Sequence, residues 1–203
     1  MAKQQTPYDT GVIHGRFQVL HNDHMKYLLS GKALCRHLVV GITNPEPELV
    51  RDETADLKRS SPSSNPLTYF ERYGLVRAAL LAEGLGPHDF SIVPLPINLP
   101  ERYRYYVPMS AVFFLSIYDQ WGERKHQYFQ SLGLKVHILR RVVPEQKGLS
   151  ASDIRNRMLM GQPWEHLVPP STLPLLASMA LVSRLNRLKR AGSNGSAARP
   201  EKE

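Results

Sequence analysis

The chain turns from strand to helix at residues 14–24, which read His-Gly-Arg-Phe-Gln-Val-Leu-His-Asn-Asp-His. The apolar run Gly11-Val12-Ile13 predicts a short strand, and Gly15 predicts the turn that ends it. A helix that begins after such a turn offers unpaired N–H groups and the positive end of its dipole to an anion. His21 and His24 are three residues apart, so both can reach one phosphate from the first helical turn. The segment predicts a phosphate site, although it also fits a histidine-rich turn without a role.

A second candidate anion site lies at residues 148–158, which read Gly-Leu-Ser-Ala-Ser-Asp-Ile-Arg-Asn-Arg-Met. Ser150 or Ser152 is a suitable N-cap, and Asp153 suits the first helical turn. The hydroxyls, the free N–H groups and Arg155 can converge on an anion. A capped helix without a ligand is the alternative for this segment alone. Two such helix starts in one chain favour an anion-binding role more strongly than either segment does alone.

Composition favours one globular domain. The chain has 203 residues, of which 42% are hydrophobic and 22% charged, which is typical of a protein with a real core. The N-terminus lacks an apolar signal region and no run of about 18 apolar residues could span a membrane, so we expect a cytoplasmic protein without a membrane partner. We assign a single domain to residues 1–190 and a disordered tail to 191–203, where Gly, Ser, Asn, Ala and Pro dominate.

The net charge of +8 fits nucleic acid, an acidic membrane surface or small anionic substrates. Much of it lies at Arg184, Arg187, Lys189 and Arg190, without the interleaved aromatic residues that favour single-stranded nucleic acid. We therefore interpret this cluster as a solvated helix face and disfavour a nucleic-acid partner.

Strand-like and helix-like runs alternate along the chain. Strands are predicted at about 10–14, 37–43, 90–95, 111–117 and 134–139, and helices at about 22–35, 68–84, 122–132 and 171–190. This rhythm predicts an α/β fold, a parallel sheet with helices on both faces and a C-terminal helical segment, in which ligands bind beyond the carboxyl ends of the strands. The amphipathic last helix covers the sheet or a neighbouring subunit, which leaves a homo-oligomer open.

The two motifs together resemble the H-x-G-H and S-x-T-x-I-R signatures of the nucleotidylyltransferase superfamily. The stretch from Gly15 to His24 is most similar to the G-R-F-Q-P-x-H-x-G-H form of archaeal-type nicotinamide-nucleotide adenylyltransferases. Val19 replaces the usual proline, and Asp23 replaces the glycine between the histidines. The Asp23 carboxylate could repel a triphosphate, help hold its magnesium or favour the helix N-terminus, and we prefer the last interpretation. The resemblance implies a Rossmann-like sheet of order 3-2-1-4-5.

Three further segments resemble the acceptor side of these adenylyltransferases. Residues 65–72 resemble N-P-F-T-x-x-E-R and make Asn65, Thr68 and Arg72 candidates, with Thr68 and Glu71 forming a capping box. Residues 94–100 lack the family's aspartate but keep Asn98, and Tyr103, Tyr105 and Tyr106 stand near the position of its stacking tryptophan. Asp119 and Trp121 follow the fourth strand, on the expected binding edge. The long polar connection 44–66 is either a lid over the substrate or a passive insertion.

The resemblance implies a magnesium-dependent enzyme that moves a nucleoside monophosphate from a triphosphate to a phosphorylated acceptor. The preferred reaction joins ATP and nicotinamide or nicotinate mononucleotide, as in NAD biosynthesis. It implies that His21, His24 and Arg16 act at the reacting phosphates, that Ser150, Ser152 and Arg155 hold the outer phosphates, and that the backbone near Gly15 and Phe17 approaches the nucleotide. Magnesium would be held mainly by the phosphates, not by a protein metal site. The alternatives are a cytidylyltransferase acting on a phosphorylated alcohol or phosphonate, and a catalytically weak nucleotide sensor.

Overall fold

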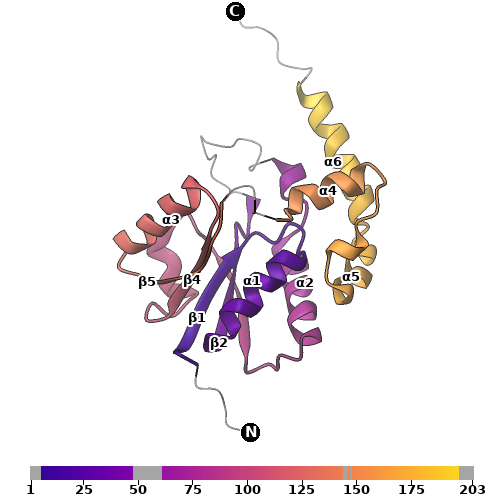
Figure 1. The fold of residues 1–203 in the computed structure, drawn as a ribbon. Coiled ribbons are helices and arrows are strands. Elements are labelled where there is room, and N and C mark those ends of the chain that lie inside the picture. The colour runs from indigo at the N-terminus through magenta and orange to yellow at the C-terminus, as the bar shows by residue number, and fades with distance from the viewer. Residues whose placement is uncertain (1–5, 48–60, 144–145, 147, 197–203) are drawn as a thin grey trace, which may run out of the picture.

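A five-stranded parallel sheet of order β3-β2-β1-β4-β5 forms the centre of the computed structural model (Figure 1). The structure describes residues 6–47, 61–143, 146 and 148–196, with side chains as far as residue 191. The strands are β1 (Tyr8–Gly15), β2 (Cys35–Thr43), β3 (Phe90–Leu95), β4 (Val112–Ile117) and β5 (Lys135–Arg141). The predicted fold class and strand order are confirmed.

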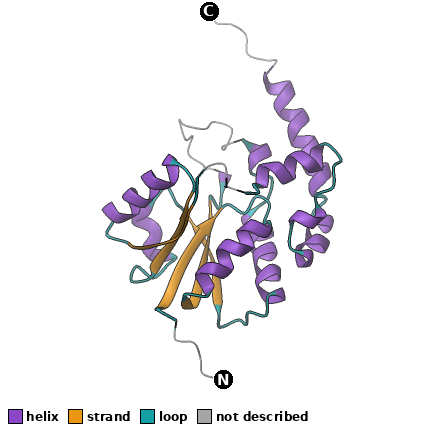
Figure 2. Ribbon diagram, in the orientation of Figure 1, coloured by secondary structure: helices purple, strands orange, loops and turns teal. Residues whose placement is uncertain are grey.

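Helices cover both faces of this sheet, as predicted (Figure 2). Helices α1 (Asn22–Lys32) and α2 (Tyr69–Ala82) pack on the face that contains Ile13 and Val40. Helix α3 (Gln120–Ser131) packs on the opposite face, where Phe129 joins a second core cluster. Because successive strand residues point to opposite faces, neighbouring residues of β1 serve different cores.

The end of α1 is earlier than predicted. The sequence favours a helix as far as residue 35, but α1 ends at Lys32 and Cys35 is the buried first residue of β2. The backbone N–H of Tyr8 donates to Leu34 O, which holds this short connection against the start of β1.

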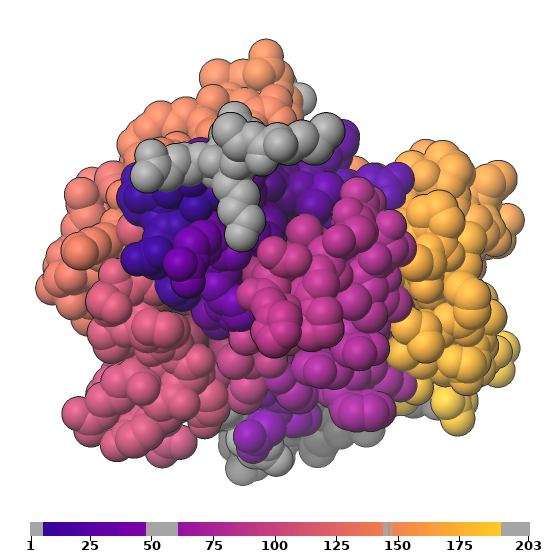
Figure 3. Space-filling model, turned by 90° about the horizontal axis from the view of Figure 1, so that it is seen from below, coloured from indigo at the N-terminus to yellow at the C-terminus, as the bar shows by residue number. Residues whose placement is uncertain are grey.

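The C-terminal segment packs beside α2 (Figure 3). It contains α4 (Ala151–Leu159), α5 (Leu173–Ser178) and α6 (Leu181–Ser196). The single helix predicted at 171–190 is wrong, because Ala180 has a left-handed φ of 47° that separates α5 from α6. Helix α6 continues six residues past the predicted boundary at 190, and the rest of the predicted tail, 197–203, lies outside the described residues.

None of the helices in the described part of the chain combines the length and the apolar character that crossing a membrane requires.

Candidate active site

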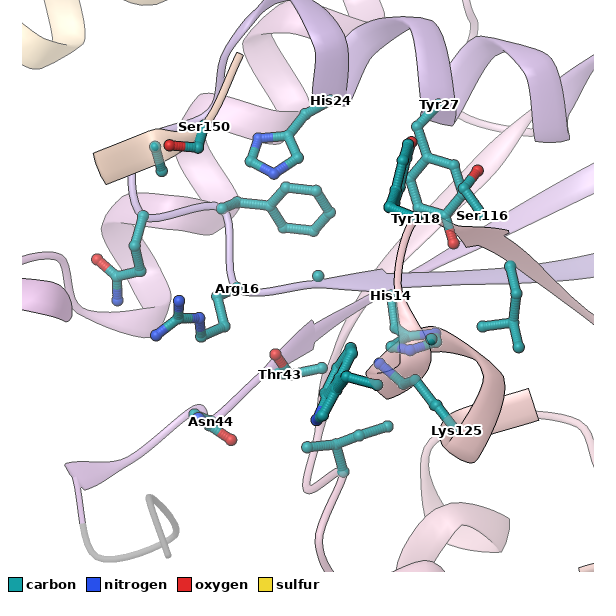
Figure 4. Close-up of a pocket in the computed structure, with 18 of the residues that line it drawn as sticks. His14, Arg16, His24, Tyr27, Thr43, Asn44, Ser116, Tyr118, Lys125 and Ser150 are labelled. Carbon is teal, nitrogen blue, oxygen red and sulfur yellow. The ribbon is translucent and has the colours of Figure 1, made fainter. Parts of the chain in front are cut away.

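A cavity of about 880 Å³ opens at the carboxyl ends of β1, β2 and β4 (Figure 4). The N-terminal ends of α1, α3 and α4 line it, and the first turn of a helix carries N–H groups that have no partner within the helix. Ten of the predicted site residues line it: Gly15, Arg16, Phe17, His21, His24, Asn98, Asp119, Trp121, Ser150 and Ser152. The two sequence motifs, more than a hundred residues apart, thus share one cavity.

His21 and His24 form a stacked pair at the start of α1. Their ring centroids are 3.6 Å apart, and His21 is the N-cap, with its Nδ1 accepting the backbone N–H of His24 at 3.3 Å. Burial lowers the pKa of His21 to about 4, although Asp23 and Asp153 partly oppose this. Desolvation, followed by the charges of His21 and Arg16, also holds the pKa of His24 well below its usual range. Both imidazoles are therefore neutral at pH 7 without a ligand, so each ring has one N–H donor and one acceptor nitrogen, and the backbone of Val19 bonds to the His24 ring.

His24 Nδ1 is buried and has no hydrogen-bond partner among the residues that the structure describes. A buried polar atom without a partner is costly, and an arriving ligand or water can satisfy it. This makes the His24 ring a candidate contact for a substrate oxygen.

The turn before α1 is held in an unusual conformation by Phe17. Its φ is 51°, a left-handed value that is uncommon outside glycine, and its ring is buried edge-on against His24 at 5.0 Å between centroids. A Cβ on Gly15 would come within 2.9 Å of the Phe17 ring, so glycine is required for this packing. The geometry brings the backbone of residues 15–17 to the cavity wall.

The second motif starts α4 with a complete capping box. Ser150 Oγ accepts the backbone N–H of Asp153 at 3.3 Å, and the Asp153 carboxylate accepts the backbone N–H of Ser150 at 2.9 Å. Ser152 also lines the cavity, and the helix start offers its remaining N–H groups there.

Arg155 lies beneath the cavity instead of in its lining. It is 6% exposed, and its guanidinium donates to the backbone oxygen of Gln18 and to Ser152 Oγ. Gln18 in turn exchanges two 2.8 Å hydrogen bonds with the backbone of Leu67. Arg155 thus joins the second motif to the first, and its contact with the outer phosphates stays a prediction.

Asp23 also joins the two motifs, in a way that the sequence does not indicate. Its carboxylate accepts the backbone N–H of Leu149 at 2.7 Å and pairs with Lys26 at 2.6 Å. A Cβ on Gly148 would lie 2.5 Å from this carboxylate, so the loop before α4 can approach it only because glycine is there. The acidic residue between the histidines thus holds the loop that leads into Ser150.

Arg72 and Thr68 support the cavity without lining it. Arg72 is 1% exposed, and its guanidinium donates to the backbone oxygens of Arg16, Thr43, Asn44 and Thr68 at 2.7–3.1 Å. Thr68 forms the predicted capping box of α2, which is confirmed. Arg72 is therefore bonded to the protein, and Thr68 is exposed at the start of α2, so neither lines the cavity with the other predicted acceptor residues Asn98, Asp119 and Trp121.

Tyr103 and Asn65 are also placed outside the lining. Tyr103 is fully buried between Phe113 and Phe129 and donates to the backbone oxygen of Ile97 at 2.6 Å. It is a core residue and does not replace a stacking tryptophan. Asn65 donates to the backbone oxygen of Ser61 at 3.1 Å, beside Ser64, which does line the cavity. Of the candidate lid at 44–66, residues 48–60 lie outside the described residues.

Several lining residues are absent from the sequence-based prediction. Among them are His14, Gln18, Tyr27, Thr43, Asn44, Ser64, Ser116, Tyr118 and Lys125. Position alone indicates some of them, because Thr43 ends β2 as Gly15 ends β1, and Asn44 follows it. Nothing local in the sequence indicates that Lys125, in the second turn of α3, points back to the sheet.

Comparisons with known proteins agree with this geometry. A phosphonoformate cytidylyltransferase from Streptomyces viridochromogenes is 44% identical over 176 residues, which cover 87% of this chain and 95% of the relative. The chain belongs to the nucleotidylyltransferases. A nicotinamide-nucleotide adenylyltransferase from Thermococcus onnurineus is 30% identical over 88% of this chain and 87% of the relative. No protein-family model matches the chain.

A solved structure shares the fold of this nucleotidylyltransferase. It is a bifunctional NMN adenylyltransferase/ADP ribose pyrophosphatase from Francisella tularensis, complexed with AMP and a manganese ion. The TM-score is 0.64 at 14% identity, over 97% of this chain and 58% of that longer one. At this identity the likeness supports the Rossmann-like fold alone.

The nucleotidylyltransferase cavity has few carboxylates for a metal ion. In the part of the chain that the structure describes, no group of three or more His, Cys, Asp or Glu side chains could hold one. The Asp23 carboxylate is already bonded to Lys26 and to the loop before α4.

Proposed function

We propose that this nucleotidylyltransferase transfers the cytidylyl group of CTP to a phosphonate oxygen of a small acceptor and releases pyrophosphate. The observation that carries the proposal is the 44% identity to a phosphonoformate cytidylyltransferase along nearly the whole of both chains. In the reaction, an acceptor oxygen forms a bond to the α-phosphorus of CTP. The bond from the α-phosphorus to the bridging oxygen breaks, and its electron pair leaves with pyrophosphate.

The proposed roles follow from the positions of the side chains in the cavity. His21, His24 and Arg16 donate to the α and β phosphates, where negative charge develops in the transition state. Ser150, Ser152 and the N–H groups at the start of α4 bind the outer phosphates and the leaving pyrophosphate. Asn98, Asp119 and Trp121 contact the acceptor or the base, as the sequence predicts. No side chain needs to become covalently attached, because positioning and charge neutralisation suffice.

Magnesium is part of this proposal. The ion would be bound by the triphosphate oxygens, with water completing its shell, and would neutralise charge on the phosphates. The protein then supplies the histidines, the hydroxyls and the helix N-termini around it.

The reaction preferred from sequence alone, with ATP and a nicotinamide mononucleotide, is the second candidate. It is favoured by the 30% identity to an archaeal adenylyltransferase. Two observations favour the cytidylyl reaction instead. The identity to the cytidylyltransferase is higher, and Tyr103, one of the three tyrosines near the expected position of an aromatic partner for the nicotinamide ring, is buried in the core.

A product assay separates the two candidates. The purified protein is incubated with magnesium and each of CTP, ATP, GTP and UTP, paired with phosphonoformate or nicotinamide mononucleotide, and pyrophosphate and the coupled product are measured. We expect turnover with CTP and phosphonoformate at least about tenfold above every other pair, a preference of about 1.4 kcal/mol in transition-state binding. Dinucleotide formation from ATP as the dominant activity would reverse the choice, and no product with any pair would favour the nucleotide sensor.

A further inference from the structure

We propose that His14 and Lys125 form a subsite for a carboxylate on the acceptor, so that the enzyme selects short phosphonates that carry a carboxylate beside the phosphonate. The inference rests on the proposed function for the identity of the phosphonate acceptor. It adds a recognition site at the end of the cavity away from the two motifs.

His14 occupies a position that the sheet would ordinarily give to an apolar residue. It lies two residues after Val12 on the same face of β1, and its ring packs 5.4 Å from that of Phe129. His14 is 6% exposed, and that small exposed area lies in the cavity lining. Its Nδ1 is buried and finds no hydrogen-bond partner within the described ranges of the chain. A histidine is costly here unless a ligand interacts with it.

Lys125 brings a cation to the same end of the cavity. Its ammonium lies 4.5 Å from the centre of the Trp121 ring and lines the cavity with His14. Figure 4 shows the Lys125 and His14 side chains converging on one side of the β1 end, with His24 and Ser150 on the other side. Burial, and next the charge of Lys125, hold the pKa of His14 well below its usual range, which agrees with a neutral imidazole beside the ammonium.

An ammonium and a neutral imidazole donor together suit an anion. A carboxylate could accept from both at once, which is the stronger, charge-assisted form of hydrogen bond. A neutral base offers no opposite charge to the ammonium, so the pair suits an anionic group better than cytosine or adenine. The starts of α1 and α4, on the opposite side of the β1 end from His14 and Lys125, suit the outer phosphates of the triphosphate. The acceptor is the remaining substrate, and in phosphonoformate the carboxylate is bonded directly to phosphorus, so it lies next to the reacting group.

The test compares two acceptors that differ in the carboxylate. Calorimetry measures the binding of phosphonoformate, methylphosphonate and CTP to the wild type, Lys125→Gln and His14→Gln. Lys135→Gln is the matched control, because Lys135 lies at the start of β5, at the opposite end of the strands from the cavity. We expect Lys125→Gln to weaken phosphonoformate at least about tenfold and methylphosphonate less than about threefold, because only the former loses a charge-assisted contact. Lys135→Gln should change neither. Lys125 is a half-buried helix residue, so its variant remains informative if His14→Gln is unstable.

The possible results separate this inference from the proposed function. Equal weakening of the two phosphonates in Lys125→Gln, or weakening of CTP alone, overturns the carboxylate subsite even where the wild type makes the cytidylyl product. Selective weakening of phosphonoformate without any cytidylyl product supports the subsite and overturns the function. A wild type that does not bind phosphonoformate overturns both.

Discussion

Two arginines and two histidines surround the same sheet edge, and they differ in what their nitrogens bond. Arg72 and Arg155 are buried, and their guanidiniums donate to backbone oxygens and a hydroxyl of the protein itself. His21 and His24 line the cavity, and Nδ1 of His24 has no partner in the ranges that the structure describes. Buried polar groups that are satisfied by the protein build the site, whereas those left unsatisfied at a cavity are available to a ligand.

We expect the largest loss of stability from a change at Arg72. Arg72→Met should leave the backbone oxygens of Arg16, Thr43, Asn44 and Thr68 without their donor. Each buried unsatisfied oxygen costs about 1–3 kcal/mol, so we expect the free energy of unfolding to fall by about 3–5 kcal/mol. Urea denaturation measures this. Arg77→Met, on an exposed position of α2, is the matched control and should change it by less than about 0.5 kcal/mol. If the two variants lose similar free energies of unfolding, the hydrogen bonds of Arg72 do not hold the site together.

A change at His24 should lower activity much more than stability, the reverse of a change at Arg72. His24→Ala removes a donor at the reacting phosphates and should lower kcat about 100-fold or more, a loss of roughly 3 kcal/mol in the transition state. Because Nδ1 makes no hydrogen bond in the described structure, stability should change much less than in Arg72→Met. Single-turnover kinetics and urea denaturation test the two statements. Unchanged turnover would end the catalytic assignment.

Arg155 tests whether a motif arginine touches the substrate. Arg155→Met should cost about 2–3 kcal/mol of stability, because the Gln18 oxygen and Ser152 Oγ lose their donor. It should weaken CTP and CMP by similar factors in calorimetry, since it acts through the loop. Arg187→Met on the exposed face of α6 serves as the control. A selective loss of CTP would instead make Arg155 a direct clamp on the outer phosphates.

The sequence predicted the fold because the fold depends on local signals. The apolar strand runs, the glycine turn at Gly15 and the capping box at Thr68 each determine their own segment, and the strand order was implied by the family resemblance. The break at Ala180 could not be predicted, because alanine gives no sign of a left-handed φ.

The site was only partly predictable, for a related reason. A motif indicates which residue types stand near the cavity, but it does not say whether an arginine points to a ligand or to backbone oxygens. Arg72 and Arg155 do the latter. Lys125 was missed because it reaches the cavity from α3 without any motif around it.

The histidine pair predicts a pH dependence of stability. Burial lowers the pKa of His21 to about 4 in the folded protein, against about 6.5 in the unfolded chain, so the unfolded chain binds more protons between these values. The contribution of neutral His21 to the free energy of unfolding is therefore complete above about pH 6.5 and declines as the pH falls towards 4. Between pH 7 and pH 5 the wild type should lose about 2 kcal/mol more than His21→Asn, which keeps an N-cap acceptor. If urea denaturation shows that both proteins lose the same free energy of unfolding between pH 7 and pH 5, the lowered pKa of His21 is contradicted.

Asp23 gives the smallest effect and the sharpest test of how the two motifs are joined. Asp23→Gly restores the residue of the family signature but removes the acceptor for the Leu149 N–H, so we expect about 1–2 kcal/mol less stability and a KM for CTP raised a few-fold. Asp23→Asn keeps an acceptor oxygen at the same place while losing the pair with Lys26, which is an exposed contact of small value. It should therefore recover most of both losses. A Gly variant that is at least about tenfold more active would instead mean that the carboxylate repels the triphosphate, a penalty above about 1.4 kcal/mol. Urea denaturation and steady-state kinetics of the three proteins at saturating magnesium separate a hydrogen-bonded link between two helix starts from an inhibitory charge, because only the link requires Asn to rescue what Gly loses.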